Sequence, residues 1–145
     1  MKLAIVEDEV ILAMALTLMV EDWGHQVVGT ADTEAAALAL VAAERPDAVL
    51  MDIRLGRRDS GLNAARLIRA SNDIPIVFCT AYADNPPIQA EVRGIGNAHL
   101  VGKPVDEDQL KWLLRSIDIR RRKIAAASPL ASRLAKALQP ASNDL

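Results

Sequence analysis

Short apolar runs alternate with helix-like segments along most of this chain, and this alternation restricts the fold more than any other feature. Five apolar runs are typical of strands: 3–6, 26–31, 48–51, 74–79 and 98–102. Apolar residues at helical spacing follow each of them: 10–23, 34–45, 61–70, 87–94 and 106–123. Strict alternation predicts parallel strands, right-handed crossovers and helices on both faces. We therefore expect a flavodoxin-like, doubly wound α/β fold, (βα)5, with a five-stranded parallel sheet and five helices.

Residues that cap or end helices lie where this pattern needs them. Gly24 follows the first helical segment, at a position where glycine commonly ends a helix. Asp32 and Thr33 can cap the second segment, and Pro46 ends it because the residue before a proline disfavours helical backbone. Asn85 lies near the start of the fourth segment, which has proline in its first turn. These signals support the predicted element order.

Length and composition limit the class of protein. The chain has 145 residues, of which 51% are hydrophobic, which suits one domain with a substantial core. Cys79 is the single cysteine, so an intrachain disulfide and a thiolate metal cage are excluded. There is no apolar run of about 18 residues or more, and the apolar stretch at the N-terminus is too short for a signal peptide. We expect one soluble, cytoplasmic domain with no membrane partner.

Charge is distributed unevenly along the chain. Residues 1–119 carry 11 Lys and Arg against 18 Asp and Glu, whereas residues 120–145 carry 6 against 1. Leucines 130, 134 and 138 form a short apolar stripe in the basic part, which is expected to be either a solvated extension or a docking segment. We divide the chain into a domain, 1–124, and a basic, possibly helical tail, 125–145. The tail is too short to be a DNA-binding domain.

A nucleotide-binding Rossmann half is the competing α/β class. It requires a glycine-rich turn after the first strand, where this chain has Glu7, Asp8 and Glu9. Carboxylates at this turn would repel a pyrophosphate, and no Walker-type phosphate loop is present. A nucleotide site is therefore disfavoured.

Ligands of doubly wound sheets bind at the carboxyl ends of the strands. In this chain those ends carry Glu7, Asp8, Asp52, Thr80 and Lys103. Each residue alone has an ordinary structural explanation, as a helix cap or a solvated charge. Three acids brought together repel one another unless a cation lies between them, and oxygen ligands of this kind suit Mg²⁺. The set therefore predicts a metal-assisted phosphoryl site with a carboxylate available as nucleophile.

Four short motifs carry a family resemblance: E-D at 7–8, M-D-I-R-L at 51–55, T-A at 80–81 and K-P at 103–104. In this order and spacing they resemble the receiver domain of two-component response regulators. The segment P-I-V-F-C-T-A-Y at 75–82 is also similar to the P-F-x-F-A-T-G-Y pattern of the FAT GUY subgroup. Ala81 stands where that pattern has Gly, and Cys79 stands where it has Ala.

The resemblance implies that Asp52 is the phosphoacceptor, receiving its phosphoryl group from a phosphohistidine of a histidine kinase or histidine phosphotransfer protein. It implies that Asp8, Asp52 and the main-chain carbonyl of Arg54 bind Mg²⁺, with Glu7 acting directly or through water. The Arg54 side chain is either a surface charge or a group that shields the phosphoryl group or engages the partner.

The resemblance also implies that Lys103, Thr80 and Ala81 surround the phosphoryl group, with Thr80 reporting its presence. Many receivers have an aromatic switch residue three positions before the lysine, where this chain has Leu100. Tyr82 is then either a packing residue or the moving part of the switch.

The expected function is a single-domain response regulator that signals by phosphorylation-dependent protein interaction, with its downstream partner open. A phosphorelay shuttle or sink between histidine kinases is the alternative. A Mg²⁺-dependent phosphatase would usually have an acid two residues after its nucleophile, where this chain has Arg54. We therefore expect a phosphoacceptor signalling protein rather than an enzyme. A structural pseudo-receiver is disfavoured because the acids, Thr80 and Lys103 are all present.

Overall fold

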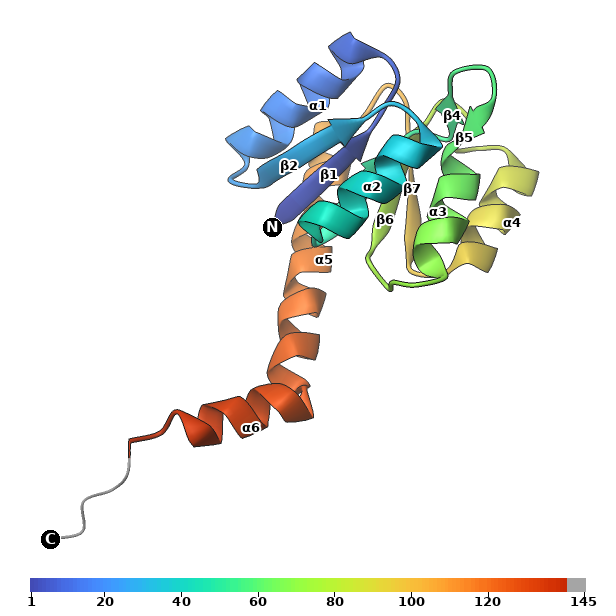
Figure 1. Ribbon diagram of the computed structural model, residues 1–145. Helices are drawn as coiled ribbons and strands as arrows, with labels where there is room; N and C mark the ends of the chain where they lie inside the picture. The colour runs from blue at the N-terminus through green and yellow to red at the C-terminus, as the bar shows by residue number, and fades with distance from the viewer. Residues whose placement is uncertain (141–145) are drawn as a thin grey trace, which may run out of the picture. The chain divides into compact units, whose positions relative to one another are not determined.

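A computed structural model, which describes residues 1–140, confirms the predicted sheet. The five parallel strands lie in the order β2-β1-β3-β6-β7, which is the flavodoxin-like order (Figure 1). Their bounds are β1 Lys2–Val6, β2 Gln26–Ala31, β3 Ala48–Met51, β6 Ile76–Thr80 and β7 Ala98–Gly102. Because β1 pairs with both β2 and β3, the chain reverses its direction across the sheet at β1. This reversal is where such folds bind ligands.

Helices follow the strands as predicted, with one addition. The helices are α1 Val10–Asp22, α2 Glu34–Glu44, α3 Gly61–Arg69, α4 Pro86–Ile95, α5 Glu107–Ala127 and α6 Pro129–Ala137. The added helix, α6, lies in the segment that was expected to be a basic, possibly helical tail. Helix α5 also extends beyond its predicted end at residue 123, since three alanines, which favour helix, continue it.

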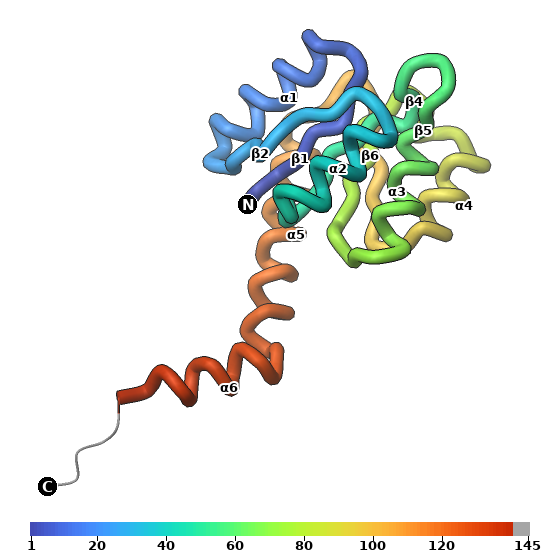
Figure 2. The backbone as a smooth tube through the Cα atoms, in the orientation of Figure 1, coloured from blue at the N-terminus to red at the C-terminus, as the bar shows by residue number. Residues whose placement is uncertain are grey.

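A small antiparallel hairpin between β3 and α3 was not predicted. It consists of β4 Arg54–Leu55 and β5 Asp59–Ser60, joined by a tight loop above α3 (Figure 2). Strands of two residues are too short for a periodic pattern to reveal. The hairpin begins two residues after Asp52, so it shapes the surroundings of that residue.

The predicted helix caps are present. The Thr33 hydroxyl accepts a hydrogen bond from the Ala36 N–H at 3.1 Å, and the Asn85 side chain accepts one from the Ile88 N–H at 3.1 Å. Arg45, in the left-handed region with φ 46°, ends α2 directly before Pro46. These contacts satisfy N–H groups at the start of helices, which explains why the elements begin where they do.

The main core lies on one face of the sheet. Side chains of alternate sheet residues, such as Val6, Met51 and Phe78, pack there against α2, α3 and α4. The intervening residues, such as Ile5, are also buried and face the opposite side. Helix α1 contacts β1 and β2 and contributes no residue to the main core, so it covers that opposite face. Both faces are therefore covered, as a parallel sheet requires.

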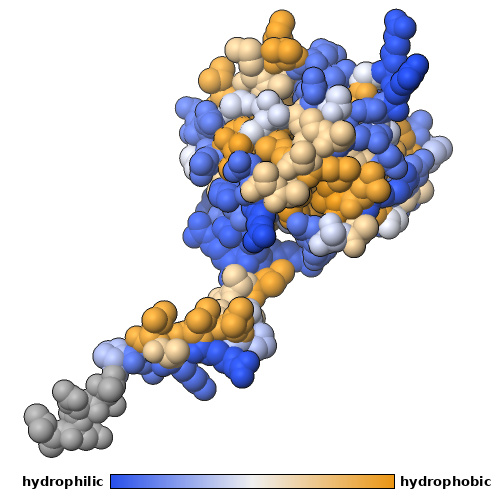
Figure 3. All heavy atoms as spheres, viewed as in Figure 1, coloured by the Kyte–Doolittle hydropathy of each residue, from blue (hydrophilic) through white to orange (hydrophobic). Residues whose placement is uncertain are grey.

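The chain divides into two compact units, residues 1–111 and the remainder from Trp112 onward. The first unit contains the sheet, α1 to α4 and the start of α5, and the second contains the rest of α5 and α6. In the second unit the leucines of α6 lie on one side of the helix and the charged residues on the other (Figure 3). The domain boundary after residue 124, which lies within α5, stays a prediction. Within residues 1–140, no helix is long and apolar enough to cross a membrane.

Adjacent positions on α3 provide a test of the main core. Ile68 is buried in it, whereas the neighbouring Leu67 is 47% exposed. Ile68→Ala should lower the free energy of unfolding by about 2–5 kcal/mol, because it leaves a cavity among packed side chains. Leu67→Ala should lower it by less than about 1 kcal/mol. Urea unfolding of both variants measures the difference, and equal losses would show that this face of α3 is not core.

Candidate functional site

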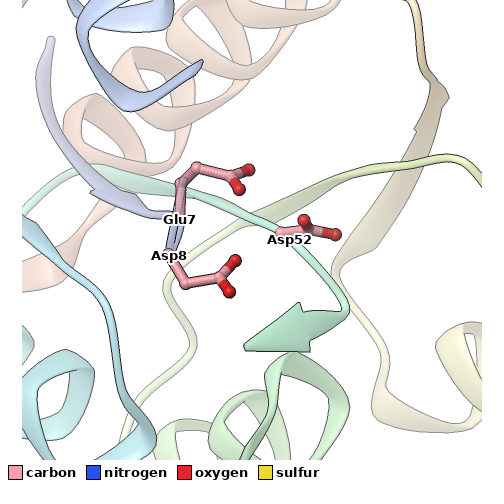
Figure 4. Close-up of side chains that lie close together, drawn as sticks. All are labelled: Glu7, Asp8 and Asp52. Atoms are coloured by element: carbon pink, nitrogen blue, oxygen red, sulfur yellow. The ribbon is translucent and has the colours of Figure 1, made fainter. Parts of the chain in front are cut away.

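Three acidic residues meet at the carboxyl edge of the sheet. Glu7 and Asp8 directly follow β1, and Asp52 directly follows β3. Because Val6 pairs with Met51 in the parallel register of these strands, the acids begin from adjacent positions. One carboxylate oxygen from each lies within 4.8 Å of the others, and the side chains extend toward a shared space (Figure 4). Glu7 is buried, Asp52 half-buried and Asp8 exposed.

Lys103 also reaches this cluster, from the position directly after the edge strand β7. Its Nζ atom lies 3.0 Å from Glu7 Oε2 and 2.9 Å from Asp52 Oδ2. Its backbone N–H also donates to the Thr80 carbonyl at 2.9 Å, which ties the end of β7 to the end of β6. One ammonium group therefore bridges two of the three carboxylates.

Burial and charge shift two pKa values in this cluster. Burial raises the pKa of Glu7, and the neighbouring Asp52 charge adds to this effect, against the opposing hydrogen bond from Lys103. For Lys103, burial alone would lower the pKa, but hydrogen bonds and charge attraction from Asp52 and Glu7 outweigh burial and raise it. The Lys103 ammonium is therefore stabilised in its charged form, whereas ionisation of Glu7 costs free energy in the folded protein.

The loop after Asp52 is fixed to the site by backbone groups. The Arg54 N–H donates to Asp52 Oδ1 at 3.4 Å, and the Gly56 N–H donates to Asp8 Oδ2 at 2.9 Å. Gly61, where α3 begins, passes so close to the Asp52 carbonyl that a Cβ atom there would overlap it. Sequence reasoning missed Gly56 and Gly61. A glycine at the first position of a predicted helix was the available signal for Gly61.

A second group of polar contacts holds the other end of this loop. The Glu34 carboxylate accepts hydrogen bonds from the Ser60 N–H at 2.7 Å and from the Asn63 side-chain amide at 2.8 Å. In return, the Glu34 N–H donates to Asp59 Oδ2 at 2.9 Å. These residues were not predicted to support the site, because nothing in the local sequence links positions so far apart. They anchor the hairpin to the start of α2.

The residues expected to form the switch lie at the end of β6 and on the loop that follows it. Thr80 is buried, and its hydroxyl accepts a hydrogen bond from the Tyr82 N–H at 3.1 Å. Ala81 is exposed, and the Arg54 guanidinium lies 5.1 Å from the centroid of the Tyr82 ring. Leu100 packs against the main core as a partly buried β7 residue. The predicted roles of these residues stay predictions.

The donor set can hold a hard divalent cation. Three carboxylates provide oxygen ligands, and Asp8 is exposed enough to be reached from solvent. Lys103 provides a positive charge beside Asp52 for an anionic group. The arrangement can therefore bring together a metal ion, a phosphoryl group and a nucleophilic carboxylate.

The buried carboxyl of Glu7 generates a pH-dependent prediction. Because its pKa is higher in the folded protein than the ordinary 4.5, the proton on Glu7 stabilises the fold below pH 4.5. That stabilisation is lost as the pH rises through the raised value. In the presence of a chelator, Glu7→Gln should therefore be more stable than the unchanged protein at pH 7, and equally stable at pH 4.

Urea unfolding at both pH values measures this difference. Glu9→Gln is the control, because Glu9 is an exposed carboxylate two residues away, and it should change stability at neither pH. A lower stability of Glu7→Gln at pH 7 would show that the ion pair with Lys103 outweighs the cost of burying Glu7.

Known proteins share both the sequence pattern and the fold. A family model described as the response regulator receiver domain matches residues 3–115. The phyllosphere-induced regulator PhyR of Methylorubrum extorquens is 37% identical over 84 residues, which are 57% of this chain and 32% of that protein. The transcriptional regulatory protein PdtaR of Mycobacterium tuberculosis is 30% identical over 138 residues, which are 95% of this chain and 66% of that protein.

A solved structure agrees with these relatives. The crystal structure of the response regulator PhyR from Brucella abortus matches with a TM-score of 0.69 and 37% identity, covering 87% of this chain and 51% of that one. The chain thus spans less than two thirds of the length of each of these three proteins. Since the receiver model covers most of the chain and the sheet has the flavodoxin-like order, the chain belongs to the response regulator receiver domain family.

Proposed function

We propose that this protein accepts a phosphoryl group from a phosphohistidine onto Asp52, with Mg²⁺, and signals through phosphorylation-dependent protein interaction. The observation that carries the proposal is the bridge from Lys103 to Asp52 inside a cluster of three carboxylates. The bridge puts a fixed positive charge beside the carboxylate that would attack. The donor would be a histidine kinase or a histidine phosphotransfer protein, and on this proposal the protein works in the cytoplasm.

The proposed step transfers one phosphoryl group between two proteins. A carboxylate oxygen of Asp52 attacks the phosphorus in line, the P–N bond to the histidine breaks, and its electron pair returns to the imidazole nitrogen. Lys103 offsets charge on a phosphoryl oxygen, and Thr80 offers its hydroxyl as a hydrogen-bond donor.

The residues that would hold Mg²⁺ are Asp8, Asp52 and the carbonyl of Arg54, with Glu7 acting directly or through water. The ion would neutralise the charge that crowds this edge and draw the phosphoryl oxygens to it. The Gly56 N–H donates to Asp8 Oδ2, and this bond would orient the carboxylate while its other oxygen binds the metal. Crowding among the three acids supports this assignment, because a cation relieves their repulsion.

We assign a signalling role rather than hydrolysis of external substrates, and two observations support this. The two relatives described above are both named as regulators. Position 54, where a phosphatase of this chemistry would usually have an acid, holds Arg54. We assign the phosphotransfer activity to residues 1–124, and the basic tail, 125–145, lies outside this domain.

A groove beside the acidic cluster suits the phosphodonor protein. It has a volume of about 480 Å³ and lies between α1, which contributes Met14 and Leu18, and the end of β2. Its lining also includes Glu7 and Asp8, so the groove is continuous with the site. Leu18 is 68% exposed, which leaves an apolar face on α1 beside the site. A helix of the donor protein seated there would hold its phosphohistidine close to Asp52.

The first prediction of the proposal concerns the phosphoacceptor. Incubation with acetyl phosphate and Mg²⁺ should add one phosphoryl group, and intact-protein mass spectrometry should detect it. Asp52→Asn or a chelator should abolish the added mass, because the nucleophile or the metal is lost. Asp84→Asn, which alters an exposed acid on the loop after β6, is the control and should be labelled normally. Equal labelling of Asp52→Asn would remove the assignment of Asp52.

The second prediction concerns the groove. Leu18→Glu should slow phosphotransfer from the histidine kinases of the host at least about tenfold, since it introduces a charge into an apolar contact. Labelling by acetyl phosphate, which needs no docking, should be much less affected. Leu67→Glu, an equivalent change on the exposed side of α3, is the control for surface charge. If Leu18→Glu and Leu67→Glu slow transfer equally, the donor docks elsewhere.

A further inference from the structure

The side chains of Arg54 and Tyr82 meet across the gap between two loops. Arg54 belongs to the hairpin after β3, and Tyr82 belongs to the loop after β6. The Arg54 Cζ atom lies 5.1 Å from the centroid of the Tyr82 ring, within the range of a cation–π contact. Both side chains are exposed, so water weakens the contact and a better partner can displace it.

The backbone of Arg54 lies next to the Asp52 carboxylate, which is proposed to be phosphorylated. Its backbone N–H already donates to Asp52 Oδ1 at 3.4 Å. A phosphoryl group on Asp52 would add negative charge and strong acceptor oxygens next to the start of this side chain. Hydrogen bonds from a guanidinium to such oxygens are roughly twice as strong as neutral ones, and the planar group can bind two oxygens at once. The phosphoryl group is therefore a stronger partner for Arg54 than an exposed ring.

Tyr82 is joined to the elements that would carry a signal away from the site. Its N–H donates to the Thr80 hydroxyl at 3.1 Å, and its carbonyl accepts from the Asn85 N–H at 3.0 Å. Asn85 caps α4, and the Gln89 side chain of α4 donates to the Ala83 carbonyl at 2.9 Å. A change in the position of Tyr82 therefore acts on the start of α4.

We propose that the Arg54 guanidinium exchanges partners on phosphorylation, leaving the Tyr82 ring for the phosphoryl oxygens on Asp52, and that this exchange frees the loop leading into α4. The inference rests on the proposed function, because it requires Asp52 to be the phosphoacceptor. Arg54 acts as a phosphoryl-contacting residue in one state and holds the loop in the other. The two states differ in one contact each, so a modest difference in affinity shifts their populations.

Binding of beryllofluoride, a mimic of the aspartyl phosphate, tests the exchange because the two residues have opposite expected effects. Arg54→Gln should weaken beryllofluoride binding, since a phosphoryl contact is lost. Tyr82→Leu should tighten it by about two- to fivefold, the range that corresponds to an exposed cation–π contact. Tyr82→Phe, which keeps the ring face, should restore the affinity of the unchanged protein. Changes in the same direction for Arg54→Gln and Tyr82→Leu would overturn the proposal.

A second measurement follows the ring itself. Tyr82 is the single tyrosine of the chain, so tyrosine labelled only at the ε positions of its ring gives one NMR signal that needs no assignment. Beryllofluoride with Mg²⁺ should shift this signal in the unchanged protein and in Arg57→Gln, a control that removes a neighbouring exposed arginine of the same loop. In Arg54→Gln the signal should already differ before addition and should shift at least about threefold less.

Phosphorylation of the same samples by acetyl phosphate distinguishes a failure of the Arg54 exchange from a failure of the proposed function. If Asp52 is labelled but the Tyr82 signal shifts equally in Arg54→Gln and the unchanged protein, the exchange is wrong and the phosphoacceptor assignment stands. If Asp52 is not labelled and beryllofluoride shifts no signal, both are wrong.

Discussion

The bridge from Lys103 to Glu7 and Asp52 is the interaction on which the candidate site depends. Three carboxylates lie within 4.8 Å of one another, and like charges this close raise each other's free energy. Lys103 reaches two of them at 3.0 and 2.9 Å and offsets much of that cost. Asp8 is left exposed, with a hydrogen bond from the Gly56 backbone, on the side from which a cation can arrive.

The apolar sheet keeps these charges together. Strands β1 and β3 are almost fully buried and paired in register, so the residues that follow them cannot move apart without breaking the sheet. The free energy gained by packing the core therefore keeps the three carboxylates close together. In a flexible chain their repulsion would move them apart. Gly61 adds to this constraint, because α3 begins in close contact with the Asp52 carbonyl.

Two loops surround the site, and they are held in different ways. The hairpin after Asp52 is anchored at one end by Asp8 and at the other by Glu34, through hydrogen bonds from backbone and side-chain groups. The loop after β6 is held by the contact of Tyr82 with Arg54 and by short hydrogen bonds around Thr80 and Asn85. The hairpin is therefore bonded to distant segments, whereas the hydrogen bonds of the second loop join near neighbours in the chain. This difference suits a switch, because a local change can move the second loop without disturbing the first.

Much of the fold could be predicted because it follows from local pattern. Alternating apolar runs and helical spacing determined the five-stranded parallel sheet, and Thr33 and Asn85 marked helix starts through their capping side chains. The same pattern identified which residues follow the strands, and parallel strands bring those residues to one edge. The sequence by itself therefore determined the fold class and the members of the acidic cluster.

Other features were decided by the tertiary structure alone. The hairpin at β4 and β5, the support of Glu34 for the Asp52 loop and the approach of Arg54 to Tyr82 all join segments that have no local signal for each other. The tail was expected to be only possibly helical, because a segment this short is not a stable helix by itself, and the structure has helix α6 there. Local periodicity reports which face of an element is apolar, but contacts between distant segments depend on how the packed elements bring single side chains together.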